Sequence, residues 1–264
     1  MDRSAYAFDA GSATHPGKVR PRNEDAHLSR ADIGLWAVAD GMGGHEAGDL
    51  ASQLIVRALD GISSAISAAQ LLQETESRLF GANRQIVEIS RQRGGAVIGS
   101  TVAVLLISED HFACIWAGDS RVYMASQGSM RQVSRDHTEV EEMIASGAMT
   151  TEEAKYWPQN AITKAVGVDE TPEFEIVSGA FQESDVFVLC SDGLTKHVSD
   201  EEILQYVSAA PPQSSCEALI ELALERGGLD NITVVVVRPA RATPSGDRTI
   251  PCVTQASPRT GIWE

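Results

Sequence analysis

Residues 19–49 read VRPRNEDAHLSRADIGLWAVADGMGGHEAGD, and this stretch sets the pattern for the rest of the chain. Its apolar run, residues 33–39, predicts a buried strand. The strand is followed by Asp40 and a turn of glycines, and from Glu46 onward the apolar residues recur with helical spacing. The stretch therefore predicts a strand, a carboxylate, a bare backbone turn and a helix, in that order.

The same stretch carries acidic residues and an arginine that suggest its chemistry. Glu24 and Asp25 precede the predicted strand, Asp40 follows it, and Arg20 lies shortly before the acidic pair. Carboxylates beside a glycine loop that begins at Gly41 suit a hard divalent cation, which prefers oxygen ligands. An arginine nearby suits a phosphate. We therefore expect distant parts of the chain to complete a metal or phosphate site.

Length and composition favour one layered domain. The chain has 264 residues, and 43% of them are hydrophobic, which is enough for a sizeable core. The 37 Asp and Glu residues outnumber the 21 Lys and Arg residues, so the formal net charge is −16. This acidity disfavours a nucleic-acid-binding protein, which needs a basic surface. It is typical of a soluble, self-repelling surface.

The sequence also indicates a compartment. The first residues do not form a charged-then-apolar signal segment, and no apolar run approaches the roughly 18 residues of a membrane span. The four cysteines are scattered and form no Cys-x-x-Cys pair, as in proteins with reduced thiols. We therefore expect a cytoplasmic protein that does not bind membranes, and we assign no chemistry to Cys114, Cys190, Cys216 and Cys252.

The remaining periodicity is rich in strands. Short apolar segments separated by tight turns predict an antiparallel meander rather than alternating strands and helices. The predicted strands are 5–10, 33–39, 100–108, 111–117, 121–125, 130–133, 161–166, 173–177, 185–190 and 231–237. The predicted helices are 46–59, 66–91, a segment after Ser199 and 216–226.

An insertion interrupts the strands between residues 135 and 167. Thr138 and Thr150 each precede a glutamate by three positions, which is the capping-box pattern and predicts two short helices. An excursion of this length between strands is usually functional or mobile. We expect one domain over residues 1–239 that includes this insertion, followed by a disordered tail over residues 240–264, where Arg, Thr, Ser and Pro dominate.

Three predicted strands meet an aspartate followed by glycine or asparagine, at Asp40, Asp192 and Asp230. Each pair alone is more typical of a turn than of a metal ligand. Asp40 and Asp192, however, are followed by helical patterns, so a hairpin does not explain them. Together with Asp25 they supply four carboxylates at strand ends, without a histidine or cysteine cluster, which indicates Mg²⁺ or Mn²⁺.

A pair of such ions would explain why the sequence shows no arrangement for a nucleophilic side chain. Two ions about 3.5–4 Å apart can hold a water or hydroxide as the nucleophile for an in-line phosphoryl displacement. That mechanism needs no nucleophilic side chain, and the sequence contains no convincing serine–histidine or cysteine–histidine arrangement.

Seven segments of the chain resemble the metal-dependent protein phosphatase (PPM, type 2C) family, in the family's order and most closely its bacterial branch. The resemblance runs from about residue 8 to residue 238. It implies an α+β fold in which a sandwich of two antiparallel β-sheets is flanked by pairs of α-helices. The segments are VRPRNED (19–25), AVADGMGG (37–44), GSTVAVLLI (99–107), WAGDSRVY (116–123), RDHTEVEEMIASGAMTTEEA (135–154), VLCSDGL (188–194) and DNITVVVV (230–237).

The resemblance implies a two-metal site of Mg²⁺ or Mn²⁺. In that site Asp40 bridges both ions and the Gly41 carbonyl binds one of them. Asp192 and Asp230 bind the other ion.

The resemblance also implies roles for residues around these ions. Glu24 and Asp25 act mainly through metal-bound waters, and Asp119 matches the ligand of a weaker third metal in bacterial members. Arg20 binds the substrate phosphate. Two alternatives stay open: Arg20 could form a surface ion pair, and Asp119 could be a turn residue in Gly118-Asp119-Ser120.

The sequence departs from many eukaryotic members at Met42, where those proteins have a histidine assigned as general acid. Methionine cannot donate a proton. Bacterial members commonly share the methionine, which leaves a metal-bound water as the preferred donor and His45 as the alternative. The segment from Asp136 to Gly167 matches the flap that the family ties to substrate choice, although His137 in it could equally be a structural hydrogen-bonding residue.

The leading hypothesis is a metal-dependent phosphatase that acts on phosphoserine and phosphothreonine in proteins. Its partners would be phosphorylated proteins, including a cognate bacterial Ser/Thr kinase and its substrates, and we expect a monomer. A catalytically silent regulatory module with the same fold is the alternative. A nucleotide-binding loop at residues 41–44 lacks the following Gly-Lys-Ser/Thr, and the acidity disfavours a two-metal nuclease.

Overall fold

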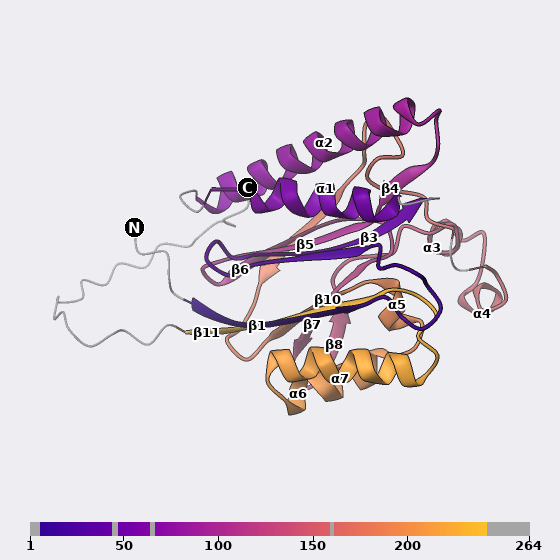
Figure 1. The fold of residues 1–264 in the computed structure, drawn as a ribbon. Helices are drawn as coiled ribbons and strands as arrows, with labels where there is room; N and C mark the ends of the chain where they lie inside the picture. The colour runs from indigo at the N-terminus through magenta and orange to yellow at the C-terminus, as the bar shows by residue number, and fades with distance from the viewer. Residues whose placement is uncertain (1–5, 44–46, 64–66, 159–160, 242–264) are drawn as a thin grey trace.

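Four layers make up the part of the chain that the computed structural model describes, residues 6–43, 47–63, 67–158 and 161–241 (Figure 1). Helices α1 (Gly48–Asp60) and α2 (Ala68–Gln92) form one outer layer. Two β-sheets form the middle, and α6 (Asp200–Ala209) and α7 (Pro212–Glu225) form the other outer layer. The predicted fold class, a sandwich of two sheets between helix pairs, is therefore confirmed.

All strand pairs in the two sheets are antiparallel. One sheet has the order β2 (Asp25–Arg30), β3 (Leu35–Gly43), β5 (Val102–Ser108), β6 (His111–Ala117) and β9 (Glu175–Ala180), and β4 (Ile98–Ser100) pairs with β3. The other has the order β1 (Tyr6–His15), β11 (Ile232–Arg241), β10 (Val186–Cys190), β7 (Arg121–Ser126) and β8 (Ser129–Gln132).

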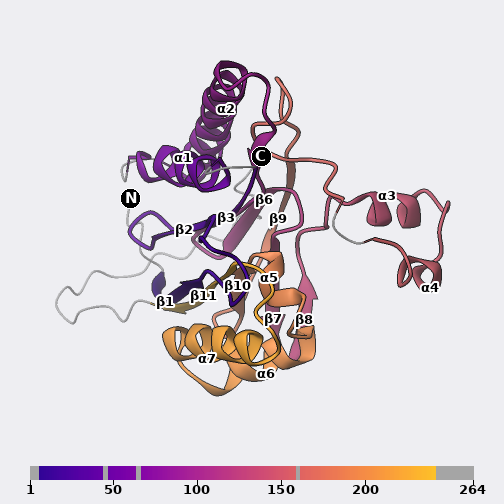
Figure 2. The same cartoon turned by 45° about the vertical axis from the view of Figure 1, so that its right-hand side comes forward.

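The predicted insertion holds α3 (Glu139–Ala145) and α4 (Thr151–Ala154), which lie to one side of both sheets (Figure 2). The backbone N–H of Glu141 donates to the Thr138 hydroxyl at the start of α3. At the start of α4, Thr150 and Glu153 cap each other reciprocally. Both predicted short helices are therefore confirmed. We call residues 135–167 the flap.

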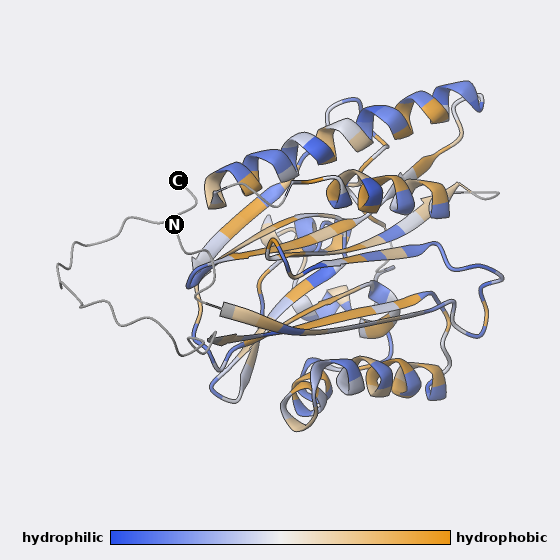
Figure 3. Cartoon of the chain, turned by 60° about the vertical axis from the view of Figure 1, so that its left-hand side comes forward, coloured by the Kyte–Doolittle hydropathy of each residue, from blue (hydrophilic) through white to orange (hydrophobic). Residues whose placement is uncertain are grey.

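The outer helices are amphipathic, and the strands they cover are mostly hydrophobic (Figure 3). Under α7, Leu219 packs with Val188 of β10 and Val234 of β11. Cys190 and Cys216 are buried in the same core. No helix in the described segments combines the length and the apolar character that crossing a membrane requires.

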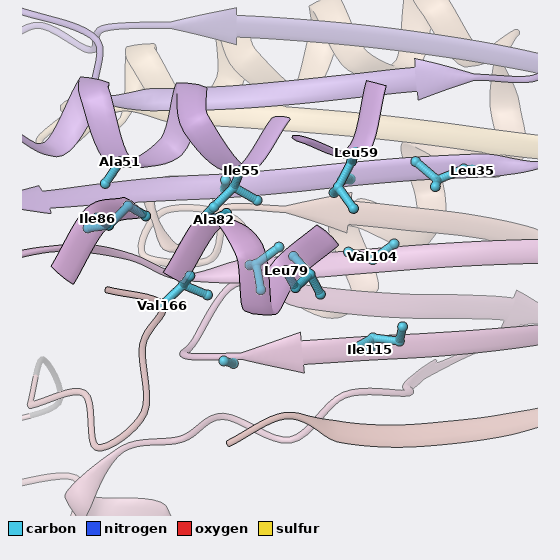
Figure 4. Packing of buried hydrophobic residues seen from close by; sticks show 14 of the residues in the cluster. Leu35, Ala51, Ile55, Leu59, Leu79, Ala82, Ile86, Val104, Ile115 and Val166 are labelled. Atoms are coloured by element: carbon cyan, nitrogen blue, oxygen red, sulfur yellow. The ribbon is translucent and has the colours of Figure 1, made fainter. Parts of the chain in front are cut away.

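Alternation along β3 divides its side chains between two cores. Leu35 packs with Ile55 and Leu59 of α1 and with Leu79 of α2, in the layer between the helices and the sheet (Figure 4). Trp36 points the other way, into the core between the two sheets. Full burial of each large apolar side chain contributes about 1.5–3 kcal/mol, so β3 is stabilised from both faces.

Three details of the predicted secondary structure are wrong. Residues 161–166 form no strand; their backbone makes only isolated bridges, from Val166 to Ser100 of β4 and from Ile162 to Thr138. Asp25 begins strand β2, which is absent from the predicted strands. Asp40 lies inside β3, which runs on to Gly43 because β4 pairs with its last residues. The glycines after Asp40 are thus extended backbone at first, not a turn.

Candidate active site

Asp25 and Asp40 are directly opposed residues of β2 and β3. Directly opposed residues of an antiparallel pair point to the same face of the sheet, and like charges in this arrangement repel each other. Asp25 is only 5% exposed and Asp40 is half-buried. The strand register therefore places two carboxyl groups side by side, where a positive charge or a proton must compensate them.

Asp25 is fixed by two hydroxyl groups, one on β11 and one on the residue that follows β10. The Ser191 and Thr233 hydroxyls both donate to its Oδ2 atom at 2.7 Å. Its Oδ1 atom is buried and has no hydrogen-bond partner among the described residues. Burial, helped by the negative charges of Asp192 and Asp230, outweighs the two hydrogen bonds and raises the pKa of Asp25 to about 6.

Hydrogen bonds between the Asp40 backbone and the residues Ser100 and Thr101 hold Asp40 in place. Its N–H donates to the Thr101 hydroxyl at 3.1 Å, and its carbonyl accepts from the Thr101 N–H and the Ser100 hydroxyl, both at 2.9 Å. Loss of solvent, together with the charges of Asp25 and other nearby carboxylates, raises the pKa of the Asp40 carboxyl well above its ordinary value. Asp40 therefore belongs to a cluster of interacting acids.

Gly41 is required by the close approach of two other segments. Its N–H donates to the Glu24 carbonyl at 3.1 Å. A Cβ atom at this position would lie 2.1 Å from the carbonyl oxygen of Gly48, which real Cβ atoms cannot tolerate. The backbone beside Asp40 therefore fits between the start of β2 and the start of α1 only as glycine.

Asp119 lies in the turn between β6 and β7 and is 7% exposed. The Ser120 hydroxyl lies 2.7 Å from that of Thr101, so one threonine connects this turn to Asp40. The Oδ1 atom of Asp119 is buried without a hydrogen-bond partner in the described chain. Burial, with the charges of Asp192 and Asp136, raises the pKa of Asp119 to about 7.

Asp192 and Asp230 share a lysine. Asp192 is the first residue of α5 (Asp192–Thr195) and Asp230 lies just before β11. The Lys196 ammonium group is 2.6 Å from Oδ2 of Asp192 and 2.9 Å from Oδ2 of Asp230. Burial raises the pKa of Asp192 despite Lys196. Burial also acts on Asp230, but there Lys196 and Arg20 hold the pKa below its ordinary value.

Arg20 makes a two-point contact with Asp230. Its Nε atom is 2.9 Å from Oδ1, and its Nη2 atom donates to Oδ2 at 3.1 Å. The structure thus shows Arg20 in an ion pair, which was the alternative that the sequence left open for it. The Arg20 side chain is 52% exposed, and the fork that grips a carboxylate is the same fork that grips a phosphate.

Glu24 lies at the edge of this cluster. Its carboxyl group is beside the backbone of Gly48, at the start of α1. Burial and the nearby charge of Asp49 raise its pKa, although Arg20 and the Gly48 N–H oppose the shift. Glu24 therefore faces the helix end more closely than it faces the aspartates.

The donor set fits hard divalent ions. All of its side chains offer oxygen, and three of the carboxylates, on Asp25, Asp119 and Asp192, each have a buried Oδ1 atom without a hydrogen-bond partner in the described part of the chain. Among the residues that the structure describes, no three histidine, cysteine, aspartate or glutamate side chains lie close enough together to hold an ion by themselves. Mg²⁺ usually keeps several waters and binds through only one or two carboxylates, so the two observations agree.

Two residues of the site were missed in the sequence. Lys196 follows Asp192 by four positions, and this spacing pairs opposite charges on a helix. The spacing could have identified Lys196 as a partner of Asp192 from the sequence. Asn231 was noted only as the neighbour of Asp230. Its amide donates to the Pro16 carbonyl at 2.9 Å and the Arg22 carbonyl at 2.8 Å, and its oxygen accepts from the Glu24 N–H at 2.7 Å.

The general acid remains a prediction. Met42 lies in β3 opposite Gly99 and is half-buried. His45, the alternative donor, lies outside the described residues. The preferred donor, a metal-bound water, is likewise a prediction that the side chains present do not test.

Comparison with known proteins gives the same picture. The protein phosphatase 2C family profile matches residues 17–221. The serine/threonine protein phosphatase PstP of Mycobacterium tuberculosis is 36% identical over 239 residues, which are 89% of this chain and 46% of PstP. The chain thus spans about half the length of this relative.

Two solved structures are similar over nearly the whole domain. PppA, described as a key regulatory component of the T6SS in Pseudomonas aeruginosa, is 38% identical with a TM-score of 0.82, covering 90% of this chain and 100% of PppA. The catalytic domain of PstP in complex with two manganese ions is 33% identical with a TM-score of 0.81. The match covers 89% of this chain and 99% of the PstP domain. With the sandwich and the aspartate cluster, these matches show that the chain belongs to the protein phosphatase 2C (PPM) family.

Proposed function

We propose that this protein is a Mg²⁺- or Mn²⁺-dependent protein phosphatase that hydrolyses phosphoserine and phosphothreonine. One observation carries the proposal: two aspartates on β2 and β3 and three in the segments next to β7, β10 and β11 interact in one cluster, and three of the five keep a buried oxygen without a protein partner in the described chain. Buried and half-buried carboxylates that lie this close together repel one another, and bound cations would offset that repulsion. The names of the similar proteins support the same reaction class.

Each carboxylate has a place in this proposal. Asp40, at the centre of the cluster, would be shared between two ions, with the Gly41 carbonyl beside it. Asp192 and Asp230 would hold one ion and Asp119 a weaker third. Two bound ions would supply positive charge to the phosphoryl oxygens and activate the attacking water.

The outer residues have supporting roles. Asp25, fixed by Ser191 and Thr233, and Glu24 would orient waters through their carboxylate oxygens. Arg20 would exchange Asp230 for the substrate phosphate, since the same guanidinium fork fits both anions. The proton for the leaving group would come from a water of the site, because Met42 cannot supply it.

A phosphothreonine peptide and p-nitrophenyl phosphate test this proposal. With Mn²⁺, wild-type protein should hydrolyse both, and excess chelator should abolish turnover. Asp40→Asn and Asp192→Asn should each lower kcat by at least about 100-fold, on the order of 3 kcal/mol. Asp60→Asn, a change of the same type in the last turn of α1, should leave turnover unchanged. Equal turnover with and without chelator would refute the metal-dependent reaction.

A silent regulatory module is the competing proposal. A silent copy has no need to keep every acidic ligand, and Asp25, Asp40, Asp192 and Asp230 are all present. No turnover by folded, Mn²⁺-bound protein on either substrate would favour the silent module. We further propose that the substrates include a cognate Ser/Thr kinase and its targets, and that the protein works as a cytoplasmic monomer.

A further inference from the structure

Three cations gather within five residues beside the proposed active site. Residues 18–22 read KVRPR, so Lys18, Arg20 and Arg22 alternate with Val19 and Pro21. All five residues are exposed. The chain as a whole has a net charge of −16, so this concentration of positive charge is opposite to the character of the surface. We call residues 18–22 the basic lip.

The basic lip is held in one conformation from both ends. The N–H of Lys18 donates to the Gly228 carbonyl at 2.7 Å. The Asn231 side chain donates to the Pro16 and Arg22 carbonyls, on either side of Arg20. These contacts tie the lip to the segment that carries Asp230. A surface ordered before binding loses less conformational entropy when a ligand arrives.

The flap carries the opposite charge. Its helices have Glu139, Glu141 and Glu142 in the first turn of α3, and Glu152 and Glu153 in the first turn of α4. The flap and the connection between β1 and β2, which contains the basic lip, lie at the same end of the sandwich (Figures 1 and 2). A bound segment would therefore meet positive charge on the lip side and negative charge on the flap side.

We propose that the basic lip selects phosphoprotein segments with an aspartate or glutamate next to the phosphorylated residue. Arg20 takes the phosphate to be removed, and Lys18 and Arg22 contact the neighbouring carboxylate. The inference rests on the proposed phosphatase function and adds a substrate class to it. The lip adjoins Asp230 through the Arg20 contact, so the phosphate and its acidic neighbour occupy one continuous surface.

Three phosphothreonine peptides test the basic lip. They share one sequence and differ only in the two residues that flank the phosphothreonine, which are Asp, Ala or Lys. Wild-type protein should give the highest kcat/KM on the Asp peptide and the lowest on the Lys peptide. The difference should shrink as ionic strength rises, because salt screens exposed charges.

Charge reversal provides the decisive comparison. The variants Lys18→Glu and Arg22→Glu should each lower the Asp-to-Ala ratio of kcat/KM about five- to tenfold, since each removes one exposed attraction and adds one repulsion. Arg84→Glu, with the same charge change on an exposed position of α2, should leave the ratio unchanged. Turnover of p-nitrophenyl phosphate, which has no flanking residues, normalises each variant for its active fraction.

The outcomes separate this inference from the proposed function. If all three peptides are hydrolysed and both reversals leave the ratio at its wild-type value, the basic lip has no part in substrate choice, although the phosphatase stands. If wild-type protein with Mn²⁺ turns over neither the peptides nor p-nitrophenyl phosphate, the proposed function itself fails. An Asp-to-Ala ratio about five- to tenfold lower in the two lip variants, with the ratio of Arg84→Glu unchanged, would establish the acidic substrate class.

Discussion

Asp25 and Asp40 face each other across neighbouring strands, and the hydroxyls of Ser191 and Thr233 tie Asp25 to the opposite sheet. Both carboxyl groups belong to one sheet, and the Thr233 hydroxyl of β11 connects Asp25 to the other sheet, so the pairing of β2 with β3 cannot form without bringing these carboxyl groups together. Their repulsion lowers the free energy of unfolding until a proton or a cation compensates it. The stability of the protein should therefore respond to pH and to metal in a specific way.

The first prediction concerns pH in the presence of chelator. The pKa of Asp25 is raised from 3.8 to about 6 and that of Asp119 to about 7. The folded protein therefore binds more protons than the unfolded chain between about pH 4 and 7, and its stability falls as pH rises through this window. The Tm in EDTA should be lower at pH 8 than at pH 5, and Mn²⁺ should raise it most at pH 8.

Asp25→Asn isolates this effect. The variant removes one raised pKa, so it should flatten the fall in stability by on the order of 2 kcal/mol. Arg226 lowers the pKa of Glu202 from 4.5 to about 2. Glu202 therefore stabilises the folded protein above about pH 4.5, and this contribution is lost only as the pH falls toward about 2. It does not account for a change in Tm between pH 5 and pH 8. A wild-type Tm that climbs steadily from pH 5 to pH 8 in EDTA would contradict the prediction.

The second prediction concerns Lys196, which lies within 2.9 Å of both Asp192 and Asp230. A cation that binds these carboxylates must displace the ammonium group. Lys196→Met should therefore tighten Mn²⁺ binding about five- to tenfold by calorimetry, while lowering stability in EDTA by about 2 kcal/mol because two partly buried acids lose their counter-charge.

Lys155→Met is the control for Lys196. Lys155 pairs with Glu152 on α4 at 2.8 Å, so its loss removes the same charge from an exposed pair. It should change neither Mn²⁺ affinity nor stability by more than about 0.5 kcal/mol. Weaker Mn²⁺ binding in Lys196→Met would mean that the lysine helps to assemble the site rather than competing for it.

The third prediction concerns Gly41. A methyl group there would lie 2.1 Å from the Gly48 carbonyl oxygen, so Gly41→Ala must push β3 away from α1. We expect a loss of about 3 kcal/mol by denaturant unfolding and a large loss of Mn²⁺ affinity. Gly81→Ala, inside α2 with only an arginine tip at 3.9 Å, should instead stabilise by about 0.5–1 kcal/mol. Equal stabilities of the two variants would refute the close approach.

The sequence predicted most of the architecture because its local signals agree with the fold. The alternation and apolar character of residues 100–117 give β5 and β6, and the capping boxes at Thr150 and Ser199 give the starts of α4 and α6. Strand β2 was missed because its sequence, DAHLSR, is mostly polar. It exists as an edge strand because β3 pairs with it, and that pairing is a tertiary contact.

The candidate site was predictable only in part for the same reason. Asp40, Asp192 and Asp230 stand out beside apolar runs and glycine or asparagine. The opposition of Asp25 to Asp40 depends on strand register, which no local pattern encodes. Segment 161–166 has apolar, β-branched residues but only an isolated bridge to the sheet at Val166, so strand propensity alone misjudged it.

The last prediction concerns His137, which joins the flap to the turn of Asp119. Its N–H donates to the Gly118 carbonyl at 3.0 Å, and its Nδ1 atom accepts from the Gly118 N–H at 3.1 Å. Its ring stacks on Trp116 at 5.9 Å, and its carbonyl accepts from the Thr163 N–H at 2.9 Å. The ring is buried, which lowers the pKa of His137, so the neutral ring accepts this bond.

His137→Phe keeps the stacking but removes the acceptor, which leaves the Gly118 N–H buried and unpaired at a cost of about 1–3 kcal/mol. Amide exchange should accelerate at residues 118–120 and at 161–167. His137→Asn, whose oxygen can take the place of Nδ1, should restore slow exchange at 118–120. His111→Phe, at the opposite end of β6, should leave both segments unchanged. Unaltered exchange at residues 118–120 in His137→Phe would mean that the turn of Asp119 keeps its shape without the flap, and the two parts of the site would then have to be treated as independent.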